Sequence, residues 1–171
     1  MTVRRLLPTD APAYRALMLE AYARHPDAFT SSAAERAVLP LSWWEARLSM
    51  APAASELVFG AFDEAARLAG AAGLSFEPRE KARHKAHLFG MYVASAGRRR
   101  GFGRALVDAA LDAARARDGV ELVQLTVTEG NAPAQALYER RGFVAFGVEP
   151  MAVKVDRDYV AKVHMWCRLR A

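Results

Sequence analysis

Blocks of apolar and polar residues along the chain predict a mixture of strands and helices. Apolar runs rich in β-branched and aromatic residues predict strands at residues 2–6, 57–62, 68–76, 86–93, 120–127, 143–148 and 159–169. Apolar residues spaced three or four apart predict helices from Thr9 or Asp10 up to Pro26, once or twice within residues 31–50 with a break at Pro40, and at residues 103–117 and 132–141. This order combines β-hairpins with strand–helix–strand crossovers. It predicts an α/β (α+β) fold with a mixed, mostly antiparallel central sheet of about seven strands and helices on both faces.

The size and composition of the chain narrow the class of protein. A chain of 171 residues is typical of one compact domain, so we expect residues 1–171 to form a single domain. No apolar run approaches the roughly 20 residues of a membrane span, and the first residues lack the pattern of a secretory signal. We therefore expect a cytoplasmic protein without a membrane partner. Cys167 is the single cysteine, so we expect a buried small apolar side chain, no internal disulfide and no metal site.

The net charge of +5 permits an anionic partner but does not identify one. A nucleic-acid partner is disfavoured, because the chain lacks the interleaved aromatic and basic residues of single-strand binding surfaces.

The segment from Arg98 to Arg104 carries the clearest chemical signal. A predicted strand ends at Val93, three arginines follow, two glycines flank Phe102, and a helix begins. Free backbone amides at a helix start favour a phosphate group, and glycine allows it to approach the backbone closely. A third glycine of the dinucleotide fingerprint is missing, and no Gly-Lys-Ser/Thr follows. A solvated basic loop with a glycine cap is the simpler alternative.

A second segment runs from Asn131 to Phe143. Asn131 is a typical helix cap, Pro133 is tolerated in a first turn, and Gly142 is suited to the helix end. Tyr138 lies two turns into this helix, where an isolated tyrosine is more often a packing residue than a catalytic one.

Together the two segments resemble the GNAT superfamily of N-acetyltransferases, which use acetyl-coenzyme A. The first family motif is matched by Arg98, Gly101 and Gly103, and the second by Asn131, Ala134, Leu137-Tyr138 and Gly142-Phe143. One helix and one strand fit between them, as in the family fold, and the flanking elements also follow the family order.

The resemblance implies the residues of the acetyl-CoA site. Backbone groups of Met91, Tyr92 and Val93 should contact the pantetheine arm and the thioester carbonyl. The pyrophosphate should lie against the amides of Arg98, Arg99, Arg100, Gly101, Phe102, Gly103 and Arg104, with Arg98 placed by its backbone rather than acting in catalysis. Asn131, Ala134 and Tyr138 should lie at the reactive end of the coenzyme. The Tyr138 hydroxyl is then the candidate general acid that protonates the departing thiolate.

The acceptor side is less defined. An arriving ammonium must lose a proton before attack, and some relatives place a carboxylate base at the position of His87. Glu129 is the other candidate base. The alternatives are a partly exposed histidine, a solvated loop acid and a water chain in place of a dedicated base. Tyr22, Trp43 and Trp44 lie in the region that often forms the acceptor pocket of this family, although one of the tryptophans is expected in the core.

The resulting hypothesis is an acyltransferase that transfers an acetyl group from acetyl-CoA to a primary amine by direct attack in a ternary complex, releasing coenzyme A. The acceptor would be a small molecule or a protein N-terminus, and a homodimer is compatible with this hypothesis. A non-catalytic acyl-CoA sensor that keeps the Arg98–Arg104 segment, here called the coenzyme loop, is the alternative.

Overall fold

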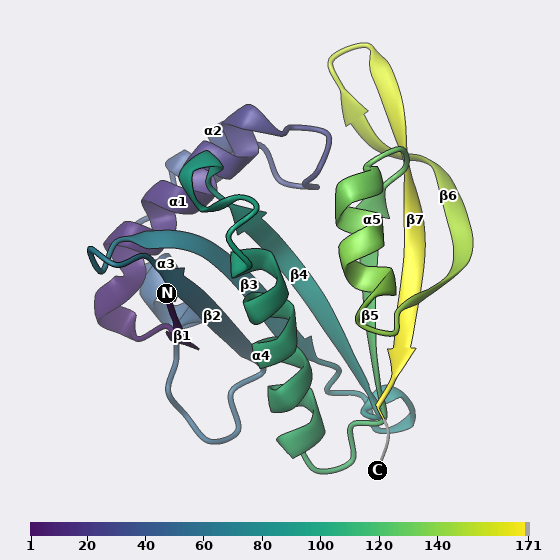
Figure 1. The fold of residues 1–171 in the computed structure, drawn as a ribbon, viewed down its shortest axis with the longest axis horizontal. Helices are drawn as coiled ribbons and strands as arrows, with labels where there is room; N and C mark the ends of the chain where they lie inside the picture. Colours follow the sequence, from purple (N-terminus) through teal and green to yellow (C-terminus); the bar gives the residue numbers. More distant parts are fainter. Residues whose placement is uncertain (170–171) are drawn as a thin grey trace.

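Seven strands form one twisted sheet in the computed structural model, which describes residues 1–169 (Figure 1). The strands are β1 (Thr2–Arg5), β2 (Glu56–Phe62), β3 (Leu68–Phe76), β4 (Lys85–Val93), β5 (Leu122–Thr128), β6 (Val144–Val155) and β7 (Asp158–Arg168). Their order across the sheet is β1-β2-β3-β4-β5-β7-β6. Neighbours are antiparallel except for the parallel pair β4–β5. The mixed, mostly antiparallel sheet predicted from the sequence is thus confirmed.

Helices cover both faces of this sheet. They are α1 (Ala11–Arg24), α2 (Ala33–Ala37), α3 (Leu41–Arg47), α4 (Phe102–Ala116) and α5 (Ala132–Glu139). The helical region after α1 is two helices, because Pro40 adopts an extended conformation and caps α3. In Figure 1, α4 and α5 lie in front of the sheet and the purple α1–α3 region lies beyond it on the left.

Each helical layer buries its own hydrophobic core. On one face, Leu106 and Ala110 of α4 belong to a cluster with Leu74 and Leu88 of the sheet. On the other face, Met18 of α1 and Trp44 of α3 belong to a second cluster with Val58 and Tyr92. Because successive residues of a strand point to opposite faces, the same strands supply both cores.

One strand boundary differs by several residues from the sequence prediction. Strand β6 continues to Val155, well past the expected end at Val148. The apolar pattern breaks there because the β6–β7 pairing is irregular between Glu149 and Val153, and Met151 has a positive φ of 53°. Such an interruption shifts the alternation of side chains without ending the strand.

A split between β4 and β5 lies at the centre of the sheet. In the described part of the chain these strands pair over Lys85–His87 and Leu122–Gln124, at their amino-terminal ends. Gly90 has a positive φ of 58°, and the β3–β4 register shifts at this point. Strand β4 therefore has a bulge at Gly90. Beyond this bulge, the β5-facing edge of Met91–Val93 is free of sheet pairing.

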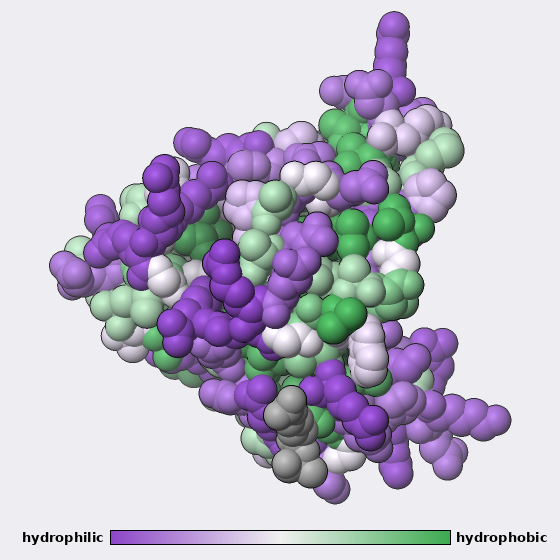
Figure 2. Space-filling view, turned by 45° about the vertical axis from the view of Figure 1, so that its right-hand side comes forward, coloured by the Kyte–Doolittle hydropathy of each residue, from purple (hydrophilic) through white to green (hydrophobic). Residues whose placement is uncertain are grey.

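The helices leave part of the sheet surface open. Figure 2 shows apolar surface gathered toward the β6–β7 hairpin. The exposed apolar side chains of this hairpin are Val144, Phe146, Val148, Met151, Tyr159 and Trp166. Among residues 1–169, no helix is both long and apolar enough to span a bilayer.

Candidate active site

The segment between β4 and α4 has the geometry of an anion-binding helix start. Gly101 caps α4 with a positive φ of 82°, and a Cβ added there would meet no protein atom within 4 Å. The Ala105 N–H donates to the Gly101 carbonyl at 3.0 Å, so the amides of Phe102, Gly103 and Arg104 precede the first bond of the helix. This arrangement has room and hydrogen-bond donors for a phosphate group.

Gly103 serves a different purpose from Gly101. A Cβ at Gly103 would lie 3.3 Å from both Met91 Cε and Leu137 Cδ2. Residues from β4, α4 and α5 therefore converge at this glycine, and its small size permits their close packing. The predicted contact segment Met91–Val93 and the two family motifs meet here in space.

The arginines of the loop are held by neighbours on several elements. The Arg98 backbone N–H donates to the Ser95 carbonyl at 3.2 Å, and its Nε donates to the Val93 carbonyl at 3.2 Å. Its Nη2 lies 2.8 Å from His25 Nε2. Because a guanidinium has no acceptor, His25 must present a lone pair at Nε2.

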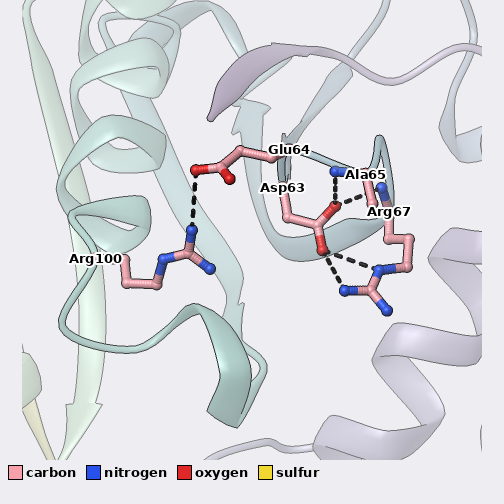
Figure 3. A network of polar contacts seen from close by, with 5 residues as sticks. All are labelled: Asp63, Glu64, Ala65, Arg67 and Arg100. Atoms are coloured by element: carbon pink, nitrogen blue, oxygen red, sulfur yellow. Dashed lines mark hydrogen bonds and ion pairs between the residues drawn. The ribbon is translucent and has the colours of Figure 1, made fainter.

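The turn between β2 and β3 also contacts the loop. Figure 3 shows Arg100 Nη2 reaching Glu64 Oε1, at 3.4 Å. Asp63 shapes this turn by accepting hydrogen bonds from the backbone of Ala65 and Arg67, both at 2.9 Å. These hydrogen bonds lower the pKa of Asp63, and the bond from the Arg67 backbone has the largest effect. The exposed Arg100–Glu64 pair positions the loop weakly.

Helix α5 places Tyr138 in the interior, in the same hydrophobic cluster as Phe102 of α4. Asn131 caps α5 by accepting from Ala134 N at 3.3 Å. Tyr138 is 6% exposed and packs edge-on against Phe143, with ring centroids 5.8 Å apart. Burial raises the pKa of Tyr138 to about 12, so its hydroxyl is protonated at neutral pH. A hydroxyl in that state can donate a proton, as the acid hypothesis requires.

His87 points to the face opposite α4, where the sheet is open. It lies in register between Ser75 of β3 and Gln124 of β5. Desolvation, followed by the nearby His164, lowers the pKa of His87, although the side chain is accessible. Met91 lies four positions further along the strand, at a distance of about 13 Å. That is too far for direct proton transfer to a group held at Met91.

The bulge at Gly90 changes which residues share a face. Simple alternation would place residues 87, 89, 91 and 93 together. In the structure Tyr92 belongs to the α1–α3 core, whereas Met91 and Val93 pack against the α4 core. His87 and the expected pantetheine contacts therefore lie on opposite faces.

The remaining candidate residues divide between core and surface. Trp44 is 1% exposed and belongs to the core. Trp43 is half-buried, with the guanidinium carbons of Arg36 and Arg47 at 4.6 Å and 4.9 Å from its ring centroid. Tyr22 packs against Phe29. Glu129 is exposed directly after β5. Cys167 is buried, and burial raises the pKa of its thiol.

Two polar contacts near the split were not predicted. The Tyr92 hydroxyl donates to Glu20 Oε1 at 3.0 Å, and Lys162 is buried with its Nζ 2.8 Å from the Asp27 carbonyl. The partners are 72 and 135 residues apart in sequence, so no local pattern could have revealed them.

Two surface cavities lie away from the coenzyme loop. One of about 370 Å³ is bordered by Trp43, Arg47 and Glu56, and one of about 260 Å³ by Phe76 and Arg117. The coenzyme loop instead presents an open surface, as a long extended ligand requires.

Comparisons with known proteins identify the family to which this fold belongs. The Acetyltransferase (GNAT) family matches residues 15–143, so the chain belongs to this family of acyltransferases. A ribosomal-protein-alanine N-acetyltransferase from Brucella melitensis is 25% identical, with a TM-score of 0.80 over 99% of this chain and 100% of that one. An acetyltransferase from Salmonella typhimurium, determined with acetyl-CoA, is 22% identical, with a TM-score of 0.80 over 100% of this chain and 95% of that one.

A sequence relative matches a shorter part of the chain. The mycothiol acetyltransferase of Beutenbergia cavernae is 57% identical over 49 residues. The match covers 29% of this chain and 16% of that protein.

The acyl donor of this family, acetyl-CoA, fits the described residues. The free amides at the start of α4 suit its pyrophosphate, and the unpaired edge of β4 suits an extended arm with amide groups. When bound, acetyl-CoA supplies an acetyl group activated as a thioester.

Proposed function

We propose that residues 1–171 form a single N-acetyltransferase domain that transfers the acetyl group of acetyl-CoA directly to a primary amine. One observation carries this proposal. The β4–β5 split is bordered by the coenzyme loop and α5 on one face and by an open sheet surface on the other. Two substrates can therefore reach the edge of β4 from opposite faces, which suits direct attack in a ternary complex without a covalent enzyme intermediate.

The residues of the site have different roles in this reaction. Backbone groups of Met91–Val93 and the amides at the start of α4 bind and orient the donor. The buried Tyr138 hydroxyl holds the proton needed by the departing thiolate. His87 is accessible on the acceptor face and its pKa is lowered, so the neutral ring can accept the proton of an arriving ammonium through intervening water. Glu129 at the end of β5 is the alternative base.

A primary amine is favoured as the acceptor class for two reasons. An ammonium group that loses its proton becomes a strong nucleophile toward a thioester. The Brucella melitensis relative is also named as a ribosomal-protein-alanine N-acetyltransferase. Which amine is used is left to the experiment.

The experiment is a panel of small amines, amino acids and peptides with free N-termini, incubated with acetyl-CoA. Release of free thiol and a mass increase of the acceptor are measured together, because thiol release alone also reports simple hydrolysis. We expect at least one amine to gain an acetyl group at a rate that saturates with both substrates. Tight coenzyme binding without transfer to any amine would instead indicate the sensor function.

A further inference from the structure

A buried lysine to which the proposed reaction gives no role lies beside the end of β5. Lys162 of β7 is 5% exposed. Its Nζ donates to the Thr128 hydroxyl at 2.9 Å and to the Asp27 carbonyl at 2.8 Å. The Thr128 hydroxyl donates to the same carbonyl at 3.0 Å. Two side chains of the sheet thus hold one backbone carbonyl of the connection between α1 and α2.

Burying this lysine costs free energy, because its ammonium group is removed from water. No carboxylate of the described chain lies within 4 Å of its ammonium. Burial lowers the pKa of Lys162, and the charge of Asp27 raises it in smaller measure. An apolar side chain of similar length would avoid this desolvation cost. The lysine therefore contributes something other than packing.

The connection held by Lys162 has a second attachment at the end of β4. His25 accepts from Arg98 at 2.8 Å, and its ring lies 5.8 Å from that of Tyr92. Residues 25–32, here called the α1–α2 loop, are thus bound to the β4 side through His25 and to the β5–β7 side through Asp27. In Figure 1 the loop beside α2 extends from the helical region toward the upper end of β5 and β7. It bridges the ends of the two strands that diverge in the sheet.

We propose that Lys162 is a positioning residue, which holds the α1–α2 loop across the β4–β5 split and so fixes one wall of the acceptor site. The loop lies on the α1–α3 face, from which the proposed function brings the amine, and this inference rests on that function. A loop that is already ordered does not lose conformational freedom when the acceptor binds. Lys162 thereby strengthens acceptor binding without touching the acceptor.

The first test requires no acceptor, so it stays informative if the proposed function fails. Arg24 and Arg36 flank the α1–α2 loop and are sites for trypsin. In the variant Lys162→Met, we expect cleavage at these two arginines to accelerate roughly tenfold, because the hydrogen bonds of a charged donor are lost. The midpoint of thermal unfolding should stay the same or rise, since a buried charge is removed. Cleavage sites are identified by mass spectrometry.

The second test measures steady-state kinetics with the amine found in the panel. Lys162→Met should raise the KM of the acceptor roughly tenfold and change kcat and the Kd of acetyl-CoA much less. Lys154→Met, at an exposed lysine of β6, is the matched control and should behave as wild type. Lys162→Arg retains donors and should recover part of the loop protection. Thr128→Val removes the second donor to the Asp27 carbonyl and should show a smaller form of the same effect. This variant also tests the inference if Lys162→Met does not fold.

Three results would overturn the inference. The first is cleavage at Arg24 and Arg36 at the wild-type rate in both Lys162→Met and Thr128→Val. The second is acceleration of cleavage along the whole chain together with a lowered unfolding midpoint, which would make Lys162 a residue of general stability. The third is loosening of the loop with an unchanged acceptor KM, which would separate the loop from the acceptor site.

Discussion

The proposed coenzyme side and the proposed acceptor side of this protein are built in different ways. The coenzyme side comes from two contiguous segments, the loop 98–104 and helix α5, together with the end of β4. The acceptor side combines α1, the α1–α2 loop, β4, β5 and β7. Its polar contacts join residues far apart in sequence, such as Tyr92 with Glu20 and Lys162 with Asp27.

This difference follows from what each side must recognise. A pyrophosphate can be held by the backbone amides of one helix start, and a glycine with positive φ is enough to shape the loop. An acceptor pocket instead needs side chains with particular chemistry around one point. Only the folding of several elements against one another brings such side chains together.

The largest effect is expected from Tyr138→Phe. If the hydroxyl protonates the departing thiolate, kcat should fall about 10²- to 10⁴-fold. The Kd of acetyl-CoA should hardly change, because phenylalanine keeps the packing against Phe143. Thiol release gives the rate and calorimetry gives the affinity. Tyr159→Phe, at an exposed tyrosine of β7, is the control. Wild-type turnover in Tyr138→Phe would leave Tyr138 as a packing residue.

A smaller effect on the coenzyme side is expected from Gly101→Ala, for which α4 offers an internal control. Gly101 and Gly119 both have positive φ, 82° and 77°, and a Cβ at either meets no protein atom within 4 Å. They flank opposite ends of the same helix, so alanine should impose similar backbone strain at both. We expect Gly101→Ala to weaken acetyl-CoA binding roughly tenfold, about 1.4 kcal/mol, and Gly119→Ala to leave it unchanged. Equal affinities of the two variants would exclude a pyrophosphate site at Gly101.

The smallest effect is expected from His87→Ala on the acceptor side. The pKa of His87 is lowered, so the neutral base forms as pH rises through a value below the usual ~6.5. The rate at low amine concentration should rise over that range in the wild type. His87→Ala should remove this limb and slow the reaction only several-fold, because a base about 13 Å from Met91 must act through water. An unchanged pH–rate profile would favour Glu129 or water alone.

Several features of the fold were predictable because they depend on near neighbours in sequence. The start of α4 follows from the glycine turn at Gly101, and the cap of α5 follows from Asn131. The division between α2 and α3 follows from Pro40. The extension of β6 past Pro150 was not predicted, since its pairing with β7 resumes after an irregularity that interrupts the apolar alternation. The pattern could also not tell which tryptophan is core, because Trp43 and Trp44 are adjacent and their burial depends on α1.

The sequence by itself determined the order of elements, the class of fold and the glycine turn at the start of α4, because φ preferences, helix caps and apolar periodicity act over a few residues. The tertiary structure decided where the strands separate, which face His87 occupies and what Lys162 holds. The bulge at Gly90 places His87 on the opposite face of the sheet from Met91 and Val93. The sheet order brings β7 beside β5, and that position alone allows Lys162 to reach Asp27 across 135 residues of chain. Contacts of this kind depend on the register of packed elements, and register is fixed by the whole sheet rather than by any one segment.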